Sequence, residues 1–162
     1  MDYYSKISKG YNDLHGAEQR QKIEIVKRAV TIPKKWLLLD VGCGTGLSSA
    51  LNCKVIGIDP SLGMLRRNRH AGVLGYAERL PFKDNAFDCV LCLTALHNFD
   101  DTKKGLEEMS RVGKNLFIFS VMKKSRNFEQ ICRTIRSRFR ISKVLDEEKD
   151  SLFICRNKQI FK

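Results

Sequence analysis

The chain has 162 residues, of which 43% are hydrophobic and 30% are charged. This is the composition of one globular domain that can build a core without disulfides or metal ions, and it excludes wholesale disorder. No stretch of 18 apolar residues is present, which excludes a transmembrane helix, and the first residues lack the apolar core of a signal peptide. We therefore expect a cytoplasmic protein without membrane association.

Basic residues exceed acidic ones, with 30 Lys and Arg against 18 Asp and Glu, for a net charge of +12. Such an excess favours attraction to an anionic partner, nucleic acid first, although a lysine-rich proteome explains it equally well. The excess lies at the two ends of the chain: residues 1–35 carry +4, residues 36–122 carry +1 and residues 123–162 carry +7. The middle of the chain is nearly neutral.

Six cysteines are spread along the chain, and four stand in apolar segments, where a free thiol behaves as a small hydrophobic group. Only Cys89 and Cys92 form a close pair, and a zinc site would need a second pair of Cys or His ligands. We therefore expect reduced thiols and no metal site.

The apolar pattern predicts short strands that alternate with helices. In chain order we expect a helix over Glu18–Val30 ended by Pro33, strands over 36–41 and 54–59 with a turn or two of helix between them, a helix from Ser61 to about His70, strands over 73–76 and 87–93, a helix from Asp100 or Asp101 to Val112, a strand over 116–121, a helix over 127–139, and strands over 140–145 and 152–156 joined by a hairpin turn. This alternation predicts an α/β doubly wound sheet whose ligands bind at the carboxyl ends of its strands.

A glycine-rich loop follows the first strand directly, in the run Asp40-Val-Gly42-Cys43-Gly44-Thr-Gly46. Glycines permit a tight turn and let a ligand reach the backbone, and the amides at the start of the next helix favour a carboxylate or a phosphate. The third glycine comes one residue too early for the Gly-x-Gly-x-x-Gly of dinucleotide sites, and no Lys-Ser/Thr follows as in a P-loop. The loop therefore counts against NAD or FAD.

Asp59 ends the second strand, at the position where a carboxylate can accept hydrogen bonds from the vicinal hydroxyls of a ribose. The alternative is a structural carboxylate that caps the helix starting near Ser61. Because strand, glycine loop and acid recur in register, the ribose interpretation is favoured. The loop and the acid together predict a nucleoside ligand that lacks a pyrophosphate.

At this point the sequence resembles the class I S-adenosylmethionine-dependent methyltransferases of the ubiquinone-biosynthesis-like (type 11) branch. The resemblance runs from about Tyr4 to Val121 and rests on five stretches in the order and spacing of that branch, which are Leu38–Gly46, Val55–Ser61 with Met64 and Leu65, Gly75–Phe82, Phe87 with Asp88, and Ala95–Asp100. Each stretch alone is weak evidence, and the five together are strong evidence.

The resemblance implies a Rossmann-like sheet of seven strands, mostly parallel with a C-terminal antiparallel hairpin, in the order 3-2-1-4-5-7-6. It also implies one domain in three parts. Residues 1–35 would form an N-terminal lid and helix, residues 36–122 the cofactor-binding core, and residues 123–162 a basic helix and the terminal hairpin.

The cofactor implied by the resemblance is S-adenosylmethionine. Its methionine part would lie against the loop of Asp40, Gly42, Cys43, Gly44 and Gly46, with its amino group near Asp40. The adenosine would contact Asp59 at the ribose, Pro60 and Met64 on the adenine faces, and the backbone N–H of Ala77 with Glu78 alongside. Leu93 and Thr94 would line the pocket under the sulfonium, and Tyr11 would close over the cofactor.

The chain also departs from the pattern of that branch. Tyr76 stands where a carboxylate usually accepts from the adenine amino group, so adenine recognition would rest on backbone groups. Only about one helix fits between the fifth and sixth strands, where the branch inserts a substrate-covering segment. We therefore expect a minimal form without its own substrate cap.

Methyl transfer from a sulfonium is an in-line displacement, for which the enzyme mainly supplies proximity and alignment. His97 follows the fourth strand, where the acceptor docks in this family, and is the candidate base or orienting group. The equally weighted alternative is a neutral histidine that packs under the helix starting near Asp100. The Asn/Asp-Pro-Pro-Tyr sequence of enzymes that methylate planar amides or exocyclic amines is absent after that strand.

The acceptor is expected to be a small molecule or a tRNA-type RNA. The RNA hypothesis rests on a basic helix face that carries Arg126, Arg133, Arg136 and Arg140, for which a merely solvated face is the alternative. A small activator protein could add a strand at the open edge of the third strand. A non-catalytic cofactor-binding or scaffold subunit that acts with a partner is the alternative function.

Overall fold

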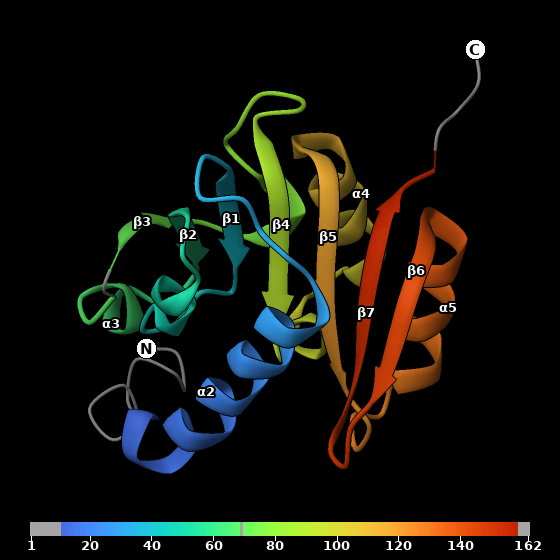
Figure 1. Ribbon diagram of the computed structural model, residues 1–162, viewed down its shortest axis with the longest axis horizontal. Coiled ribbons are helices and arrows are strands. Elements are labelled where there is room, and N and C mark those ends of the chain that lie inside the picture. Colours follow the sequence, from blue (N-terminus) through green and yellow to red (C-terminus); the bar gives the residue numbers. More distant parts are fainter. Residues whose placement is uncertain (1–10, 69, 159–162) are drawn as a thin grey trace.

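The computed structural model describes residues 11–68 and 70–158, and these residues build one seven-stranded sheet (Figure 1). The strands are β1 Leu37–Val41, β2 Lys54–Asp59, β3 Ala71–Leu74, β4 Phe87–Leu93, β5 Gly113–Met122, β6 Phe139–Asp146 and β7 Asp150–Asn157. They lie in the order β3-β2-β1-β4-β5-β7-β6. The pairs among β1 to β5 are parallel, whereas β7 runs antiparallel to both β5 and β6. The predicted Rossmann-like sheet with its strand order and terminal hairpin is confirmed.

Helices cover the two faces of this sheet unequally. The α-helices are α2 Tyr11–Ala29, α3 Leu62–Leu65, α4 Thr102–Val112 and α5 Phe128–Arg138, and three short 3₁₀ helices span η1 Leu47–Ala50, η2 Ala77–Arg79 and η3 Leu96–Asn98. In Figure 1, α2 crosses the near face of the sheet, and α4 and α5 pack on the far face. Because η1 is a single turn, α2 is the main cover of the near face.

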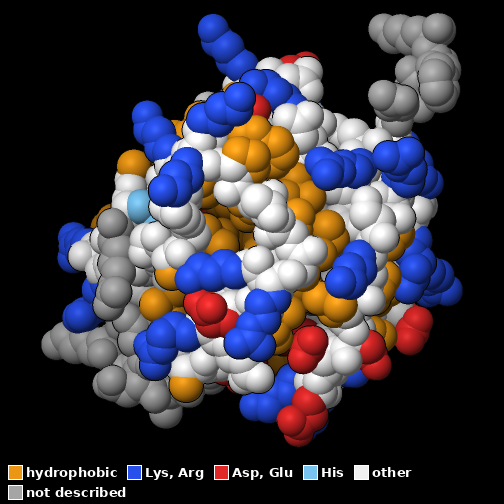
Figure 2. Space-filling model, viewed as in Figure 1, with side chains coloured by type: hydrophobic (Ala, Val, Ile, Leu, Met, Phe, Trp, Pro, Cys, Tyr) orange, Lys and Arg blue, Asp and Glu red, His pale blue; other side chains and the backbone are white. Residues whose placement is uncertain are grey.

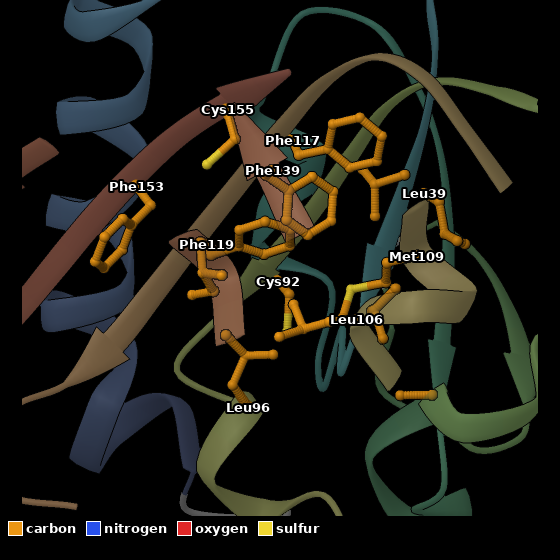
Figure 3. Close-up of a cluster of buried hydrophobic side chains, with 14 of the residues drawn as sticks. Leu39, Cys92, Leu96, Leu106, Met109, Phe117, Phe119, Phe139, Phe153 and Cys155 are labelled. Atoms are coloured by element: carbon orange, nitrogen blue, oxygen red, sulfur yellow. The ribbon is translucent and has the colours of Figure 1, made fainter. Parts of the chain in front are cut away.

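The core on the far face is aromatic. Phe117, Phe119 and Phe139 are fully buried, and the ring of Phe139 lies 4.8 Å from that of Phe117 and 5.0 Å from that of Phe119 between ring centroids (Figure 3). Each such pair adds about 0.5–1.5 kcal/mol beyond the area that it buries. Since Phe139 begins β6 and the other two belong to β5, the cluster fixes the α5 crossover against the sheet.

The near-face core is aliphatic and holds α2 in place. Ile23 and Val26 of α2 are buried against a layer that includes Leu38, Leu91 and Ile118 of the sheet. These two helix positions are three residues apart, which places them on one face of the helix. The contact fixes the direction in which the first turns of α2 approach the carboxyl ends of β4 and β5.

Arg111 of α4 holds the loop between β3 and β4. Its guanidinium donates to the carboxylates of Glu108 and Asp84 and to the carbonyl oxygens of Leu80 and Phe82, at 2.7–3.0 Å. These bonds raise the pKa of the guanidinium, chiefly through Glu108. Arg111 thus anchors the segment that follows Tyr76–Glu78, one wall of the site described below.

Two elements differ from the sequence prediction near residue 68. The helix expected from Ser61 to about His70 ends at Leu65, and β3 begins at Ala71 instead of residue 73. The side chain of Asn68 accepts from the backbone N–H of His70 and donates to the carbonyl oxygen of Gly44, at 2.9 and 3.2 Å. Asparagine bonds of this kind compete with the helix, so the chain turns early and pairs with β2 sooner.

The helix predicted over Glu18–Val30 is longer than expected, because it begins at Tyr11. The basic helix α5 packs on the face of the sheet opposite α2 (Figure 1). Its exposed arginines therefore do not replace a cap over the near face. Within residues 11–68 and 70–158, no helix has the length and apolar character needed to cross a membrane.

Candidate functional site

The glycine loop turns sharply at the carboxyl end of β1. Gly42, Gly44 and Gly46 have φ angles of 73°, 51° and 78°, a region that L side chains rarely adopt. A Cβ on Gly42 would lie 2.5 Å from Cβ of Ala95, so the close approach of the β4 end also requires glycine there. The backbone N–H of Gly42 donates to the carbonyl oxygen of Ile58 at 2.8 Å, which ties the loop to β2.

Asp59 lies beside this loop at the end of β2. One carboxylate oxygen accepts from the N–H of Gly44 at 2.9 Å, and the other accepts from the N–H of Ser61 at 2.8 Å. Ser61 in turn caps α3 by accepting from the N–H of Met64 at 3.4 Å. Both interpretations of Asp59 therefore have support in the geometry. The carboxylate orders the turn into α3, and Asp59 also lines the cavity described next.

A cavity of about 160 Å³ opens between Asp59 and the ends of β3 and β4. The structure brings nine of the predicted cofactor-contacting residues to its walls, which are Gly42, Gly44, Asp59, Pro60, Met64, Tyr76, Ala77, Glu78 and Leu93. Met64 is buried and forms the inner wall, whereas Tyr76 is 61% exposed at the rim. Residues of four of the five sequence motifs thus line one cavity, and Phe87 and Asp88 of the remaining motif lie elsewhere.

Asp40 lies in a second, smaller cavity of about 50 Å³, which adjoins the first at Gly42, Gly44 and Leu93. Its carboxylate accepts from Oγ of Ser48. Burial raises the pKa of Asp40 to about 7, and Asp59 adds to the increase, while the bond from Ser48 opposes it. A cationic ligand group beside this carboxylate would stabilise its ionised form, which burial disfavours.

Three further residues were predicted to contact the cofactor: Cys43 and Gly46 in the loop and Tyr11 in the lid. The thiol of Cys43 also lines the Asp40 cavity, 3.0 Å from Nδ2 of Asn68, and burial raises its pKa. Gly46 contributes its backbone turn and precedes η1. Tyr11 begins α2, and its side chain lies outside the part of the chain that the structure describes.

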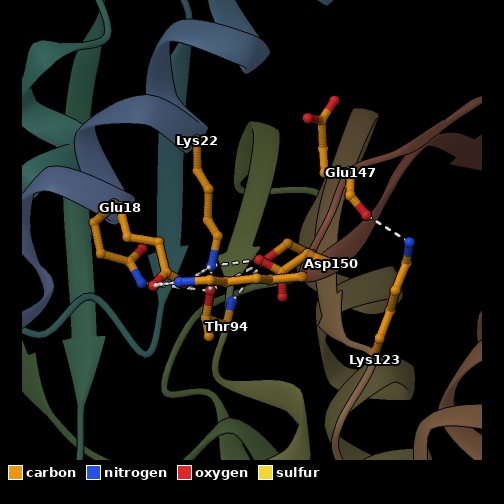
Figure 4. A network of polar contacts seen from close by, with 9 residues as sticks. Glu18, Lys22, Thr94, Lys123, Glu147 and Asp150 are labelled. Carbon is orange, nitrogen blue, oxygen red and sulfur yellow. Dashed lines mark hydrogen bonds and ion pairs between the residues drawn. The ribbon is translucent and has the colours of Figure 1, made fainter.

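A polar network at the end of β4 was not predicted from the sequence (Figure 4). Thr94 has a φ of 56°, which is strained for a β-branched residue, and its N–H donates to Oγ of Ser120 at 2.8 Å. Lys22 of α2 donates to Oγ1 of Thr94 at 2.7 Å and to Glu18 at 3.0 Å, and it forms an ion pair with Asp150 of β7. Three distant parts of the chain meet here, so no local motif marks the network.

His97 lies in η3, next to this network. Burial lowers its pKa, the charge of Asp150 opposes that effect, and the charge of Lys22 adds to it. The imidazole is therefore neutral at pH 7 and can accept a proton. It does not line either of the cavities described above.

A sequence pattern described as a methyltransferase domain matches residues 39–119, half of the chain. The chain belongs to the class I S-adenosylmethionine-dependent methyltransferases. S-adenosylmethionine is the cofactor of this family, and the match spans the glycine loop, Asp59 and the end of β4.

Two relatives show how far the sequence similarity extends along the chain. An uncharacterized protein of Methanocaldococcus jannaschii, MJ1252, is 30% identical over 91% of this chain and 66% of its own length. A demethylmenaquinone methyltransferase of Corynebacterium kroppenstedtii is 44% identical over 48% of this chain and 37% of its own length. The chain thus matches 66% of the length of the uncharacterized protein and 37% of the length of the demethylmenaquinone methyltransferase.

Solved structures share the fold of this methyltransferase chain. The PH0226 protein of Pyrococcus horikoshii matches with a TM-score of 0.79 at 19% identity, over 98% of this chain and 100% of that one. A chain in the complex of the Haloferax volcanii Trm112 methyltransferase activator with a methyltransferase matches with a TM-score of 0.79 at 15% identity, over 98% and 99%. Magnesium protoporphyrin IX methyltransferase of Synechocystis, solved with bound S-adenosylmethionine, matches with a TM-score of 0.70 at 18% identity, over 86% and 80%.

Proposed function

We propose that the chain is an enzyme that transfers a methyl group from S-adenosylmethionine to a separate acceptor. The observation that carries the proposal is the pair of carboxylates on either side of the glycine loop. Asp40 is the penultimate residue of β1 and Asp59 is the last residue of the neighbouring parallel strand β2, and their two cavities adjoin at Gly42, Gly44 and Leu93. A ligand with an ammonium group at one end and a ribose at the other suits this arrangement.

The residues present fit that cofactor. Asp59 would accept from the ribose hydroxyls, and Asp40 would pair with the amino group of the methionine part. Met64 and Tyr76 would contact the adenine, with Tyr76 in the place of the carboxylate that the family usually has. The bound cofactor supplies a methyl group activated on a sulfonium, and Leu93 and Thr94 would line the space beside it.

His97 is proposed as the base or orienting group on the acceptor side. It is neutral at pH 7 because burial lowers its pKa, and it lies near Asp150 and Lys22 at the same edge of the sheet. A base is needed only where the acceptor arrives protonated. His97 would then take that proton, while the fixed ends of β4 and β5 align the acceptor.

The acceptor is proposed to be a small molecule, because a third cavity lies next to Thr94 between α2 and the β6–β7 hairpin. A tRNA-type RNA is the second candidate. Exposed arginines on α5, among them Arg133 and Arg136, favour it, although they lie on the face opposite α2.

A tritiated-methyl assay on separate small-molecule, tRNA and protein fractions of a cell extract tests the proposal. We expect label in the small-molecule fraction, and none with an Asp59→Ala variant, which loses the ribose contact. Label in tRNA that disappears when Arg133 and Arg136 are replaced by Ser would establish the RNA candidate instead. Tight cofactor binding with no labelled fraction would favour the alternative of a non-catalytic subunit.

We also propose that a small activator protein adds a strand to β3. This strand pairs only with β2 among the described residues, and Leu74 and Tyr76 at its end and Leu62 of α3 are 57%, 61% and 47% exposed. An edge strand flanked by exposed apolar side chains is a template for strand addition. The Haloferax volcanii complex supports a Trm112-type partner.

Gel filtration of the chain mixed with a Trm112-type protein tests this partner. We expect one co-eluting complex, and its loss in a Leu74→Asp variant that still binds the cofactor. A matched Val144→Asp variant changes an exposed apolar residue of β6, at the other edge of the sheet, and should leave the complex intact. Equal losses in both variants would contradict docking at β3.

A further inference from the structure

The third cavity, of about 420 Å³, lies beside the network of Figure 4. Its walls come from the middle of α2, from Ser120 near the end of β5, and from the β6–β7 hairpin. Ser120 also touches Thr94, with 3.2 Å between their hydroxyl oxygens, and Thr94 lines the cavity assigned to adenosine. The two cavities are therefore lined by residues that touch each other, Ser120 in one and Thr94 in the other.

At this boundary the donors of Lys22 are all used, whereas one acceptor atom of Asp150 is not. Lys22 is 9% exposed in its side chain, and its three N–H groups already have Glu18, Thr94 and Asp150 as partners. Asp150 is 4% exposed in its side chain, and its Oδ1 has no hydrogen-bond partner among the described residues. The buried cation is saturated, whereas the buried carboxylate has an acceptor to offer. A ligand group that reaches Oδ1 of Asp150 would therefore be one that donates a hydrogen bond.

The charge of the side chains that line the cavity also favours a ligand that carries N–H donors. Four carboxylates line the cavity, from Glu18, Glu147, Glu148 and Asp150, against the two ammonium groups of Lys22 and Lys149. The chain as a whole carries +12. On the face shown in Figure 2, acidic side chains gather at the lower right, toward the β6–β7 hairpin. An acidic hollow in a basic protein attracts cations and repels phosphates and carboxylates.

We infer that this cavity is the acceptor site and that it selects an amine. The inference rests on the proposed methyl transfer. An N–H of the acceptor would donate to Oδ1 of Asp150, which would orient its lone pair toward Thr94 and the cofactor cavity. The acceptor class is a small primary or secondary amine, and phosphate-bearing and carboxylate-bearing molecules are excluded.

The direction in which charge moves explains why an acidic lining suits an amine. An amine that enters as an ammonium first gives one proton to the base, proposed above as His97, which frees its lone pair. That lone pair then forms the new N–C bond while the methyl C–S bond breaks, and the electron pair of the broken bond stays on sulfur. Positive charge thus leaves the sulfonium and arrives on the nitrogen, which afterwards releases one proton to water. Carboxylates fixed around the nitrogen stabilise that charge as it develops.

An NMR titration of the ¹⁵N-labelled chain with benzylamine, benzyl alcohol and benzoate tests the inference. The three probes share a ring and differ in charge. With S-adenosylhomocysteine present, and again without it, we expect benzylamine to shift the amides of Ser120, Asp150 and Leu152 with saturation, and benzoate to shift none of them. Tighter binding of benzoate, or no shift of these amides by benzylamine, overturns the inference.

Single substitutions distinguish a loss of amine recognition from a loss of the folded state. Asp150→Asn should lower the affinity for benzylamine about tenfold and change the affinity for benzyl alcohol by no more than about twofold, because the substitution removes the charge and keeps the shape of the side chain. Glu148→Gln changes an exposed hairpin residue and should lower the affinity for benzylamine about twofold. This variant keeps the test usable if Asp150→Asn does not fold. Glu129→Gln, on the exposed face of α5, is the matched control and should change nothing. An equal effect of the two Glu variants contradicts the inference.

The same samples keep the two proposals apart. Failure of S-adenosylhomocysteine to bind would contradict the proposed methyl transfer, while the titration without it would still report on the cavity. Normal binding of S-adenosylhomocysteine together with absent or benzoate-preferring shifts would contradict only the amine acceptor.

Discussion

The ionisation of Asp40 offers a quantitative test of the cofactor site. This carboxyl is buried at the end of β1, and burial raises its pKa from the ordinary 3.8 to about 7. Only its ionised form can pair with the amino group of S-adenosylmethionine, so cofactor affinity should fall as the pH falls through 7. About half of the Asp40 side chains are ionised at pH 7 and about 1% at pH 5, which predicts an affinity loss of about fiftyfold.

The stability of the ligand-free protein should respond with the opposite sign. The pKa of Asp40 is higher in the folded state than in the unfolded state, so between pH 3.8 and about 7 the folded chain holds a proton that the unfolded chain has released. The contribution of Asp40 to the free energy of unfolding therefore increases as the pH is lowered through 7. Above pH 7 the ionised group costs at most about 4 kcal/mol. Asp40→Asn should remove that cost and stabilise the ligand-free chain at pH 8.

Calorimetric titration with S-adenosylmethionine at pH 7, 6 and 5 measures the first effect, and urea unfolding at pH 8 measures the second. The Asp40→Asn variant should bind weakly at pH 7, with little change down to pH 5, and should unfold at higher urea than the parent chain. A cofactor affinity that stays constant between pH 7 and pH 5, or that falls equally in Asp40→Asn, would refute the pairing with Asp40.

Three further predictions concern the same edge of the sheet. Gly42→Ala should destabilise the chain by more than about 1 kcal/mol in urea unfolding, because its φ is positive and its Cβ would meet Ala95; unchanged stability would contradict the strained turn. Lys22→Met should cost about 3–5 kcal/mol in the same assay by leaving Asp150 buried without its cation, and a loss below about 1 kcal/mol would show that the ion pair is dispensable. His97→Ala should lower turnover of the acceptor about 100-fold with little effect on cofactor affinity, and unchanged turnover would end its proposed role as a base.

The sheet could be predicted because its buried parallel strands are continuous apolar runs, and because each motif occurs at a strand end. The strand Lys54–Asp59 and the strand Phe87–Leu93 match the prediction residue for residue. That the predicted cofactor-contacting residues gather around one cavity could be expected for the same reason, since the residues at the carboxyl ends of parallel strands meet at one edge.

What could not be predicted depends on contacts between distant residues. The short α3 follows from Asn68 reaching across to Gly44, a bond invisible in helix periodicity. The pairing of Lys22 with Asp150 joins the first helix to the last strand, and each residue alone reads as an ordinary surface charge. The acidic cavity was hidden by the net charge of the chain, because its carboxylates come from both ends of the sequence.

The most direct test of the central claim is a calorimetric titration of the chain with S-adenosylmethionine at pH 8, with NAD as the comparison ligand. Two carboxylates flanking a glycine loop that lacks dinucleotide spacing predict one saturable site for S-adenosylmethionine and none for NAD. Absence of heat with S-adenosylmethionine at high concentration, or saturable binding of NAD instead, would contradict the account.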